Sequence, residues 1–285
     1  MELAASPSVW WLAIRPRTLT AAVAPVIAGT AVAARLGAAR PVAALLALFT
    51  SVFIQIGTNL ANDYSDFKRG ADAERVGPVR VTQSGLIAPA AVKRAAWLAF
   101  GVAAAAGVSL IFLAGWPVAV IGILSIASGW LYTGGPWPLG YHGLGDVFVF
   151  VFFGLVATCG TVYVQALRVP EAAWLAGAAV GALATAILVV NNLRDRETDA
   201  RVGKRTLAVK IGPTLTRFEY VLLVASAFAL APFLGRPWPL LALPLAVMPL
   251  RGVLRSQGAA LNPAVGETAR LQLAYALLLA VELWP

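Results

Sequence analysis

The sequence contains almost none of the side chains that build disulfides, thiolate clusters or histidine sites. Its one cysteine, Cys159, excludes a disulfide framework and any thiolate metal cluster. Its one histidine, His142, excludes catalysis through a histidine pair and any metal site with several imidazole ligands. We interpret Cys159 as a small buried hydrophobic residue and His142 as a surface residue of a loop. Catalytic chemistry must therefore come from other polar side chains.

Charge is also scarce. Charged residues make up 12% of the 285 residues and hydrophobic residues 60%, with a mean hydropathy of +0.79. This composition is typical of a chain that lies mostly within a membrane, and we interpret residues 1–285 as one integral-membrane domain. A net charge of +9 would suggest nucleic-acid binding in a soluble protein. Here membrane topology explains the charge, and we expect no nucleic-acid partner.

Long apolar runs occur along the whole chain. A helix needs about 20 mostly apolar residues to cross the hydrocarbon core of a membrane. Runs of this kind lie near residues 18–37, 41–62, 91–114, 116–133, 144–167, 172–194, 215–235, 237–255 and 267–284. Three prolines, Pro239, Pro244 and Pro249, interrupt the eighth run. The sequence therefore predicts an all-α membrane protein with nine transmembrane helices around a central cavity.

The distribution of basic residues predicts the orientation. Cytoplasmic loops of membrane proteins carry an excess of Lys and Arg. With a cytoplasmic N-terminus, nine spans leave only Arg35, Arg40, Arg168 and Arg236 on the opposite side, and the other 18 of the 22 basic residues face the cytoplasm. A miscounted span in the middle of the chain would remove this asymmetry. We expect a multi-pass protein of the plasma membrane with its N-terminus inside.

Seven of the thirteen acidic residues gather in two short stretches. Residues 62–74 read NDYSDFKRGADAE, and residues 191–205 read NNLRDRETDARVGKR. The first stretch follows the second predicted span and the second follows the sixth. Because an even number of crossings returns the chain to the same side, both stretches are expected at cytoplasmic helix ends. They can then face each other across the bundle.

Each acidic stretch places one carboxamide and two carboxylates on one face of a helix, since residues three or four apart are neighbours there. The two stripes are Asn59, Asp63 and Asp66, and Asn191, Asp195 and Asp199. Their charges can be those of solvated loops balanced by basic neighbours. Against this, asparagines at positions 59, 62, 191 and 192 lie one turn inside apolar spans, where polar groups are costly and usually functional. Paired carboxylates also repel each other, and Mg²⁺, which prefers oxygen ligands and completes its shell with water and substrate phosphates, removes that repulsion.

Basic side chains follow both acidic stripes. They are Lys68, Arg69, Arg75 and Arg80 after the first, and Lys204, Arg205 and Lys210 after the second. Arg presents a planar fork to phosphate oxygens, and Lys acts as a point charge. Two Mg²⁺-binding stripes flanked by such cations indicate a diphosphate site at the mouth of an apolar bundle. This arrangement suits a lipid diphosphate whose head lies at the metals and whose tail lies between the helices.

These stretches resemble a known family. NDYSDFKRGAD is similar to the first aspartate motif of the UbiA superfamily of intramembrane prenyltransferases, and DRETD is similar to the second. Four further stretches resemble its branch that acts on 1,4-dihydroxy-2-naphthoate: RPRTLTAAVAPVIAGTA near the start, VTQSGLI at 81–87, YTGGPWPLGYHGLGDVFVFVFFG at 132–154, and GKRTLAVKIG at 203–212. The resemblance covers about residues 15–215. The sequence departs from the ubiquinone-type members at Asp72, which stands six residues after Asp66 where a spacing of four is common.

The resemblance implies a set of site residues. Mg²⁺ would be held by the candidate catalytic residues Asp63, Asp66, Asp195 and Asp199. The diphosphate would be bound by Lys204, Arg205, Arg80 and Lys68. The substrate pocket would include Asn59, Asn62, Asn191, Asn192, Asp72, Gln83, Ser84, Tyr132, Asp146 and Arg15. Arg15 would pair with the carboxylate of the acceptor, and its other reading is an ordinary topology determinant.

The resemblance also implies the reaction. A polyprenyl group would pass from polyprenyl diphosphate to 1,4-dihydroxy-2-naphthoate with loss of diphosphate and CO₂, giving demethylmenaquinol. Ionisation of the diphosphate leaves an allylic carbocation, which reacts with the electron-rich ring in a water-poor cavity. The active site would face the cytoplasm. The prenyl chain length, the catalytic base and the oligomeric state stay open.

Two other readings compete with this one. A UbiA-type enzyme can act on another aromatic or sugar-phosphate acceptor, because the motifs specify the prenyl diphosphate better than the acceptor. The chain can also be a secondary transporter that uses paired carboxylates to couple cations. Transporters place such sites near the membrane midplane, whereas these carboxylates lie at helix ends beside basic loops. A CDP-alcohol phosphotransferase would need a helix start of the DG-x₂-AR type, which the sequence lacks.

Overall fold

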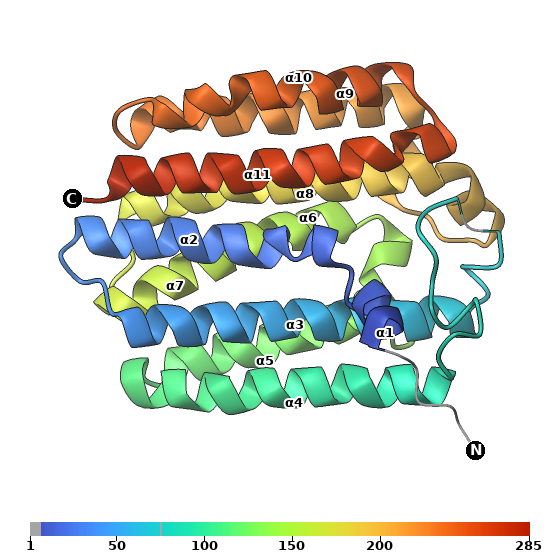
Figure 1. Cartoon of the computed structure of the whole chain (residues 1–285), viewed down its shortest axis with the longest axis horizontal. Coiled ribbons are helices and arrows are strands. Elements are labelled where there is room, and N and C mark those ends of the chain that lie inside the picture. The colour runs from blue at the N-terminus through green and yellow to red at the C-terminus, as the bar shows by residue number, and fades with distance from the viewer. Residues whose placement is uncertain (1–6, 75) are drawn as a thin grey trace.

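The computed structural model describes residues 7–74 and 76–285, and all regular elements within these ranges are helices. The helices lie side by side along the long axis of the molecule (Figure 1). Each of the nine apolar runs expected from the sequence contains helix. The predicted all-α fold is therefore confirmed.

The first half of the chain forms five helices and one short turn. They are α1 (Pro7–Ile14), the 3-10 turn η1 (Pro16–Thr18), α2 (Thr20–Arg35), α3 (Pro41–Lys68), α4 (Pro89–Ala114) and α5 (Trp116–Leu131). Prolines start α3 and α4, because the fixed φ of proline suits the first helical position. Gly115, with φ 84°, ends α4 and turns the chain directly into α5. A bend of 51° separates Ser8–Thr18 from Thr20–Arg35.

The second half begins with a span that changes its helical type. The 3-10 turn η2 (Leu139–His142) leads to α6 (Gly145–Val149), the π-helical η3 (Phe150–Val156) and α7 (Ala157–Ala166), which together form one stretch. The remaining elements are α8 (Glu171–Arg201), α9 (Leu207–Leu230), η4 (Ala231–Phe233), η5 (Trp238–Ala242), α10 (Leu243–Arg255), η6 (Gly258–Leu261) and α11 (Asn262–Leu283). The proline-rich eighth run is thus a 3-10 turn followed by a shorter helix, as expected where proline removes backbone donors.

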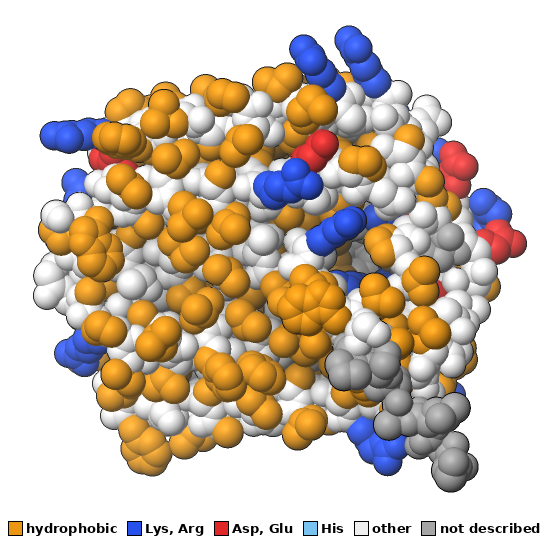
Figure 2. Space-filling model, in the orientation of Figure 1, with side chains coloured by type: hydrophobic (Ala, Val, Ile, Leu, Met, Phe, Trp, Pro, Cys, Tyr) orange, Lys and Arg blue, Asp and Glu red, His pale blue; other side chains and the backbone are white. Residues whose placement is uncertain are grey.

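The helices are those of a multi-pass membrane protein. Within the described residues, seven helical stretches are long and apolar enough to cross a membrane, and the bent pair of α1 and α2 makes an eighth. The 16 residues of α5 form a shorter apolar helix. Hydrophobic side chains cover most of the face shown in Figure 2, and most of its charged side chains lie toward the ends of the bundle. The count of nine crossings and the side of the N-terminus stay predictions.

The centre of the bundle is α8, which is rich in Ala and Gly and buried around most of its circumference. It packs against η3 at a point where only glycine fits. A Cβ added at Gly154 would lie 2.6 Å from Cα of Gly181, so the two backbones touch directly. Small residues allow such close approach between membrane helices. The close packing fixes the position of α8, whose C-terminal end carries the second acidic stripe.

The C-terminal ends of α3 and α8 lie at the same end of the bundle, with the 69–88 loop beside the connection from α8 to α9 (Figure 1). α1 lies at this end too, and the C-terminus lies at the other. The arginines at positions 35, 40, 168 and 236 belong to connections at that opposite end. The two ends therefore carry the charge asymmetry that the sequence predicts, with both acidic stripes on the basic side.

Candidate active site

Three segments converge around the two acidic stripes: the end of α3 with the 69–88 loop, the 132–144 loop, and the end of α8 with residues 202–206. Tyr141, in the 132–144 loop, joins them. Its hydroxyl donates to Asp66 Oδ1 at 2.9 Å, and its carbonyl accepts from the backbone N–H of Arg205 at 3.0 Å. The structure therefore brings the two stripes to either side of one loop.

Asp63 is held by the loop that follows its own helix. The residue is 1% exposed, and its Oδ1 accepts the backbone N–H of Thr82 at 3.1 Å. On the other side, Nη2 of Arg15 lies 3.8 Å from Oδ2. Thr82 belongs to the 69–88 loop, which folds back over the end of α3. A backbone donor and a nearby guanidinium charge thus orient Asp63 before any substrate binds.

Arg80 connects the other two aspartates of the first stretch. Its Nη2 lies 3.4 Å from Asp66 Oδ2, and its Nε lies 3.4 Å from Asp72 Oδ1. All three side chains are buried. Asp72, six residues after Asp66, thus reaches Arg80 and lies next to the stripe that contains Asp63 and Asp66.

The second stripe contains one tightly paired carboxylate and one that is partly free. Arg194 donates to both oxygens of Asp195, at 2.8 and 2.7 Å, and to Asn262 Oδ1 of α11 at 3.1 Å. Lys204 Nζ lies 3.3 Å from Asp199 Oδ1. Asp199 Oδ2 is buried and has no hydrogen-bond partner among the described residues. This oxygen is the carboxylate atom most clearly available to a cation.

Asn59 holds the bend between α1 and α2. Its amide donates to the carbonyl of Ile14 at 2.8 Å and to Thr18 Oγ1 at 3.2 Å. Between them Arg15 has a left-handed backbone, with φ 58° and ψ 71°. A non-glycine residue in this conformation is strained by about 1–3 kcal/mol and persists only where the surroundings enforce it. The Arg15 side chain lies toward Asn59 and Asp63, since Nη2 donates to the carbonyl of Asn59 at 3.3 Å and lies 3.8 Å from Asp63 Oδ2.

The remaining asparagines have structural partners or are buried. Asn62 Oδ1 accepts from Thr133 Oγ1 at 2.7 Å, which fastens the 132–144 loop to α3. Asn191 donates to the carbonyl of Ile187 within its own helix at 3.1 Å. Asn192 is buried. Asn59 and Asn191 therefore each bond to a backbone carbonyl group near the acidic residues.

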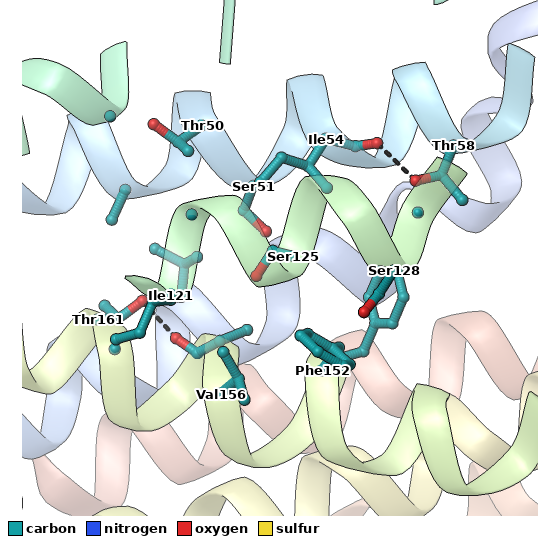
Figure 3. Close-up of a pocket in the computed structure, with 18 of the residues that line it drawn as sticks. Thr50, Ser51, Ile54, Thr58, Ile121, Ser125, Ser128, Phe152, Val156 and Thr161 are labelled. Atoms are coloured by element: carbon teal, nitrogen blue, oxygen red, sulfur yellow. Dashed lines mark hydrogen bonds between the residues drawn. The ribbon is translucent and has the colours of Figure 1, made fainter. Parts of the chain in front are cut away.

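An apolar cavity lies below the acidic residues, between α3, α5 and the η3–α7 stretch (Figure 3). Its empty volume is about 1070 Å³, including its open side. Hydroxyls at positions 50, 51, 58, 125, 128 and 161 interrupt an otherwise hydrophobic wall, and Phe152, Ile121 and Val156 lie opposite α3 (Figure 3). A largely apolar lining of this kind suits a hydrocarbon chain better than a polar ligand.

Tyr132 lines the upper part of this cavity, and Asp146 lies behind it. The Tyr132 hydroxyl packs against Gly145, where an added Cβ would approach it to 2.7 Å. Asp146 is 6% exposed, and its Oδ2 has no hydrogen-bond partner among the described residues. The carboxyl of Asp146 is close enough to Tyr132 to act on its hydroxyl electrostatically.

Other candidates from the sequence lie further from the acidic side chains. Lys68 and Arg205 are exposed, and Arg205 contacts the site through its backbone N–H. Gln83 and Ser84 are exposed on the 69–88 loop, where Ser84 Oγ donates to the carbonyl of Arg80 at 2.8 Å. Lys210 donates to the carbonyl of His142 at 2.6 Å, and Arg75 lies outside the described residues. Cys159 is buried as expected, and His142 is partly buried against Trp137.

Sequence reasoning missed four residues that contact the carboxylates or their partners: Thr82, Tyr141, Arg194 and Asn262. Burial and the negative charge of Asp66 raise the pKa of the Tyr141 hydroxyl above its usual value, so Tyr141 remains a hydrogen-bond donor at neutral pH. The only signal in the sequence was that Thr82 and Tyr141 lie inside family-like stretches. Their side-chain types alone indicate nothing.

The donor set fits divalent cations that are bound partly by substrate. Among the described residues no three Asp, Glu, His or Cys side chains are placed to share one ion, so an ion bound here would take fewer than three ligands from these side chains. Mg²⁺ usually takes one or two carboxylates and completes its octahedral shell with water and substrate phosphates. The unpartnered oxygen of Asp199 is a free ligand position for such an ion. The arrangement can bind a metal–diphosphate complex above an apolar cavity.

Comparisons with known proteins identify the family and the fold. A model described as the UbiA prenyltransferase family matches residues 22–263. The 1,4-dihydroxy-2-naphthoate octaprenyltransferase of Mycobacterium tuberculosis is 47% identical over 283 residues, covering 97% of each chain. The enzyme of the same name from Escherichia coli is 40% identical, covering 92% of this chain and 90% of that one. A solved structure of a UbiA homolog from Archaeoglobus fulgidus, bound to DMAPP and Mg²⁺, has a TM-score of 0.61 and 17% identity over 95% of this chain and 99% of that chain, which shows a shared fold.

Proposed function

Because this chain belongs to the UbiA prenyltransferase family, we propose that it transfers a polyprenyl group from polyprenyl diphosphate to 1,4-dihydroxy-2-naphthoate, with loss of diphosphate and CO₂. The product is demethylmenaquinol. The observation that carries the proposal is the position of two buried carboxylate pairs above an apolar cavity, in a chain whose relatives of 35–47% identity bear that name.

The polar head of the prenyl substrate binds between the two acidic stripes. Asp63 and Asp66 on one side and Asp195 and Asp199 on the other would hold Mg²⁺, which when bound would supply Lewis-acid stabilisation of the charge on the leaving diphosphate. Lys204 and Arg80 lie beside these carboxylates, at 3.3 Å from Asp199 and 3.4 Å from Asp66, and neutralise diphosphate oxygens. The diphosphate head is thereby bound at the basic end of the bundle.

The hydrocarbon tail extends into the cavity. Its wall of aliphatic and aromatic residues excludes water, which protects the allylic cation from hydrolysis after the C–O bond breaks. Tyr132 and Phe152 line the same cavity and present aromatic faces that favour a nearby positive charge. The protein contributes position and electrostatics, and the substrate supplies the leaving group.

The aromatic acceptor binds near Arg15. This guanidinium lies 24% exposed and 3.8 Å from Asp63, so it can bind the acceptor carboxylate beside the diphosphate. The ring carbon that attacks the allylic cation gains the prenyl group, and CO₂ leaves with the electron pair of its C–C bond returned to the ring. A cytoplasmic site would receive the soluble acid directly, in agreement with the basic end of the bundle.

The proposal is tested with membranes that contain the protein, labelled prenyl diphosphates and a panel of aromatic acids. The expected product has the mass of a prenylated naphthoquinol that lacks the carboxyl group. EDTA should stop the reaction, and added Mg²⁺ should restore it. Preferred conversion of another aromatic or sugar-phosphate acceptor would favour a UbiA-type enzyme with a different acceptor. Absence of any prenyl transfer would contradict the proposed function and favour the secondary-transporter alternative.

The metal assignment is tested separately with Asp63→Ala and Asp195→Ala. Each variant should lose prenyl transfer while the helical bundle stays folded by circular dichroism. Glu197→Ala is the matched control, because Glu197 lies on the same helix end as Asp195 but is 72% exposed. Retained turnover in either aspartate variant would falsify the metal assignment.

A further inference from the structure

Tyr141 contacts the first acidic stripe and the residues that follow the second, although the proposed mechanism gives it no role. Its hydroxyl donates to Asp66 Oδ1 at 2.9 Å, so one carboxylate of the first stripe is oriented by a side chain 75 residues further along the chain. Its carbonyl accepts the N–H of Arg205, the residue that follows Lys204. Tyr141 is therefore bonded to the first stripe through its side chain and, through its backbone, to the segment that follows the second stripe.

The aromatic ring makes a second set of contacts. The ammonium nitrogen of Lys204 lies 5.6 Å from the ring centroid, and the guanidinium carbon of Arg69 lies 5.4 Å from it. Both distances are within the range of cation–π attraction. Lys204 also pairs with Asp199 at 3.3 Å, so the ring and the carboxylate hold the ammonium group from two directions.

The two cations at this ring have different uses. Arg69 donates to the carbonyls of Thr133 and Gly135, so its guanidinium fastens the 132–144 loop to the end of α3. Lys204 instead lies next to Asp199, the carboxylate with the unpartnered oxygen. Arg69 thus fixes the loop that carries Tyr141, and Tyr141 fixes Lys204.

We propose that Tyr141 is a positioning residue that sets the distance between the two Mg²⁺–carboxylate sites and holds Lys204 over the diphosphate. This inference rests on the proposed function, since it concerns the same diphosphate site. Partners that orient metal ligands usually matter for affinity, and their loss costs about 10- to 100-fold in metal binding or activity. The hydroxyl acts on Asp66 and the ring acts on Lys204, so the two effects can be separated by substitution.

Tyr141→Phe removes the bond to Asp66 and keeps the ring, and Tyr141→Leu removes both. Binding is measured on purified protein in detergent, as the rise in melting temperature produced by inorganic diphosphate at increasing Mg²⁺ concentrations. Tyr141→Phe should need about tenfold more Mg²⁺ for half of the stabilisation. Tyr141→Leu should need at least as much Mg²⁺ and should also bind inorganic diphosphate more weakly at saturating Mg²⁺, because Lys204 loses its ring contact. Steady-state kinetics should show a higher KM for prenyl diphosphate in both variants.

The matched control is Tyr64→Leu. Tyr64 also has a lysine over its ring, with Lys93 Nζ 5.6 Å from the centroid, but it packs against the apolar residues of α1 and α4. This variant should keep the Mg²⁺ and diphosphate dependence of the parent protein even if its melting temperature falls. The comparison separates a general loss of protein stability from the misplacement of Asp66 and Lys204 at the diphosphate site.

The possible failures are distinguishable. If the parent protein shows no Mg²⁺-dependent stabilisation by inorganic diphosphate, the proposed diphosphate site is wrong and this inference falls with it. If the parent is stabilised and both Tyr141 variants respond at the same concentrations as the parent, only the role of Tyr141 is overturned. Tyr141→Phe could respond to Mg²⁺ and diphosphate as the parent does while Tyr141→Leu responds more weakly. This result would overturn the proposed role of the hydroxyl at Asp66 and support the role of the ring at Lys204.

Discussion

Arg194 and Asp195 are consecutive residues of α8 whose side chains form a two-point ion pair, with Nε 2.8 Å from Oδ1 and Nη2 2.7 Å from Oδ2. Consecutive residues of a helix point about 100° apart, so the arginine must fold across the helix to reach its neighbour. Asn262 of α11 accepts from the third nitrogen, and the Arg194 side chain is only 2% exposed. A Cβ at Gly77 would lie 2.6 Å from Nη2, so the 69–88 loop closes over the pair. The pair therefore links the second acidic stripe to α11 and to the loop of the first.

Arg194→Met should destabilise the protein, because Asp195 would remain buried without its partner. Removal of one member of a buried ion pair typically costs about 3–5 kcal/mol. Added Mg²⁺ should recover part of this loss, since a divalent cation can take the place of the guanidinium. Thermal unfolding in detergent, with and without Mg²⁺, measures both effects. Arg196→Met is the control: Arg196 pairs with Glu197 at 3.1 Å, but their side chains are 30% and 72% exposed, so its loss should cost at most about 1 kcal/mol. Equal stability of the two variants would contradict the structural role of Arg194.

Asp66→Asn and Asp72→Asn should differ in severity. Asp66 belongs to the stripe and contacts both Tyr141 and Arg80, whereas Asp72 lies at the far side of Arg80. We expect Asp66→Asn to abolish prenyl transfer and Asp72→Asn to retain turnover with a higher KM for prenyl diphosphate, because Arg80 loses one anchor. Steady-state kinetics with varied prenyl diphosphate make the comparison. Complete loss of turnover in Asp72→Asn would make Asp72 a metal ligand in spite of its spacing.

Gly107→Leu should shift the enzyme toward shorter prenyl diphosphates. Gly107 lines the cavity from α4, and a Cβ built there meets no other atom within 4 Å, so a larger side chain fits and fills the space. We expect the ratio of kcat/KM for long over short prenyl diphosphates to fall about tenfold, because the loss of one methylene contact in a hydrophobic pocket changes kcat/KM by about this factor. Gly101→Leu is the control on the same helix, since Gly101 is exposed and lies outside the cavity wall. The same ratio in both variants would show that the tail lies elsewhere.

Arg15→Lys should weaken binding of the acceptor more than binding of the prenyl diphosphate. Lysine keeps the positive charge but loses the planar fork that suits a carboxylate. Loss of a hydrogen bond to a charged group corresponds to about 10- to 100-fold in affinity, which should appear in the KM for the naphthoate. Arg17→Lys is the control, because Arg17 is exposed two residues away. A change confined to the KM of the prenyl diphosphate would assign Arg15 to the diphosphate site instead.

Local patterns in the sequence are sufficient for the helices and for the position of the acidic stripes. The apolar runs coincide with helices, and prolines begin α3 and α4. Counting crossings places Asp63 and Asp195 at one end of the bundle because helices that span a membrane alternate in direction. The loop residues were harder to assign. Thr82 orients Asp63, whereas its neighbours Gln83 and Ser84 are exposed, and no spacing rule distinguishes one from the others.

The sequence by itself determined that this chain is a bundle of apolar helices with two carboxylate stripes on its basic side, because helical periodicity and hydropathy are properties of neighbouring residues. Only the tertiary structure decided what orients those carboxylates. Tyr141 reaches Asp66 across 75 residues, and Asn262 reaches Arg194 across 68. The strained backbone of Arg15 likewise depends on Asn59 of another helix. Such contacts depend on how loops and helices pack in space. Their free energy comes from residues far apart in the sequence, so no pattern among neighbouring residues reveals them.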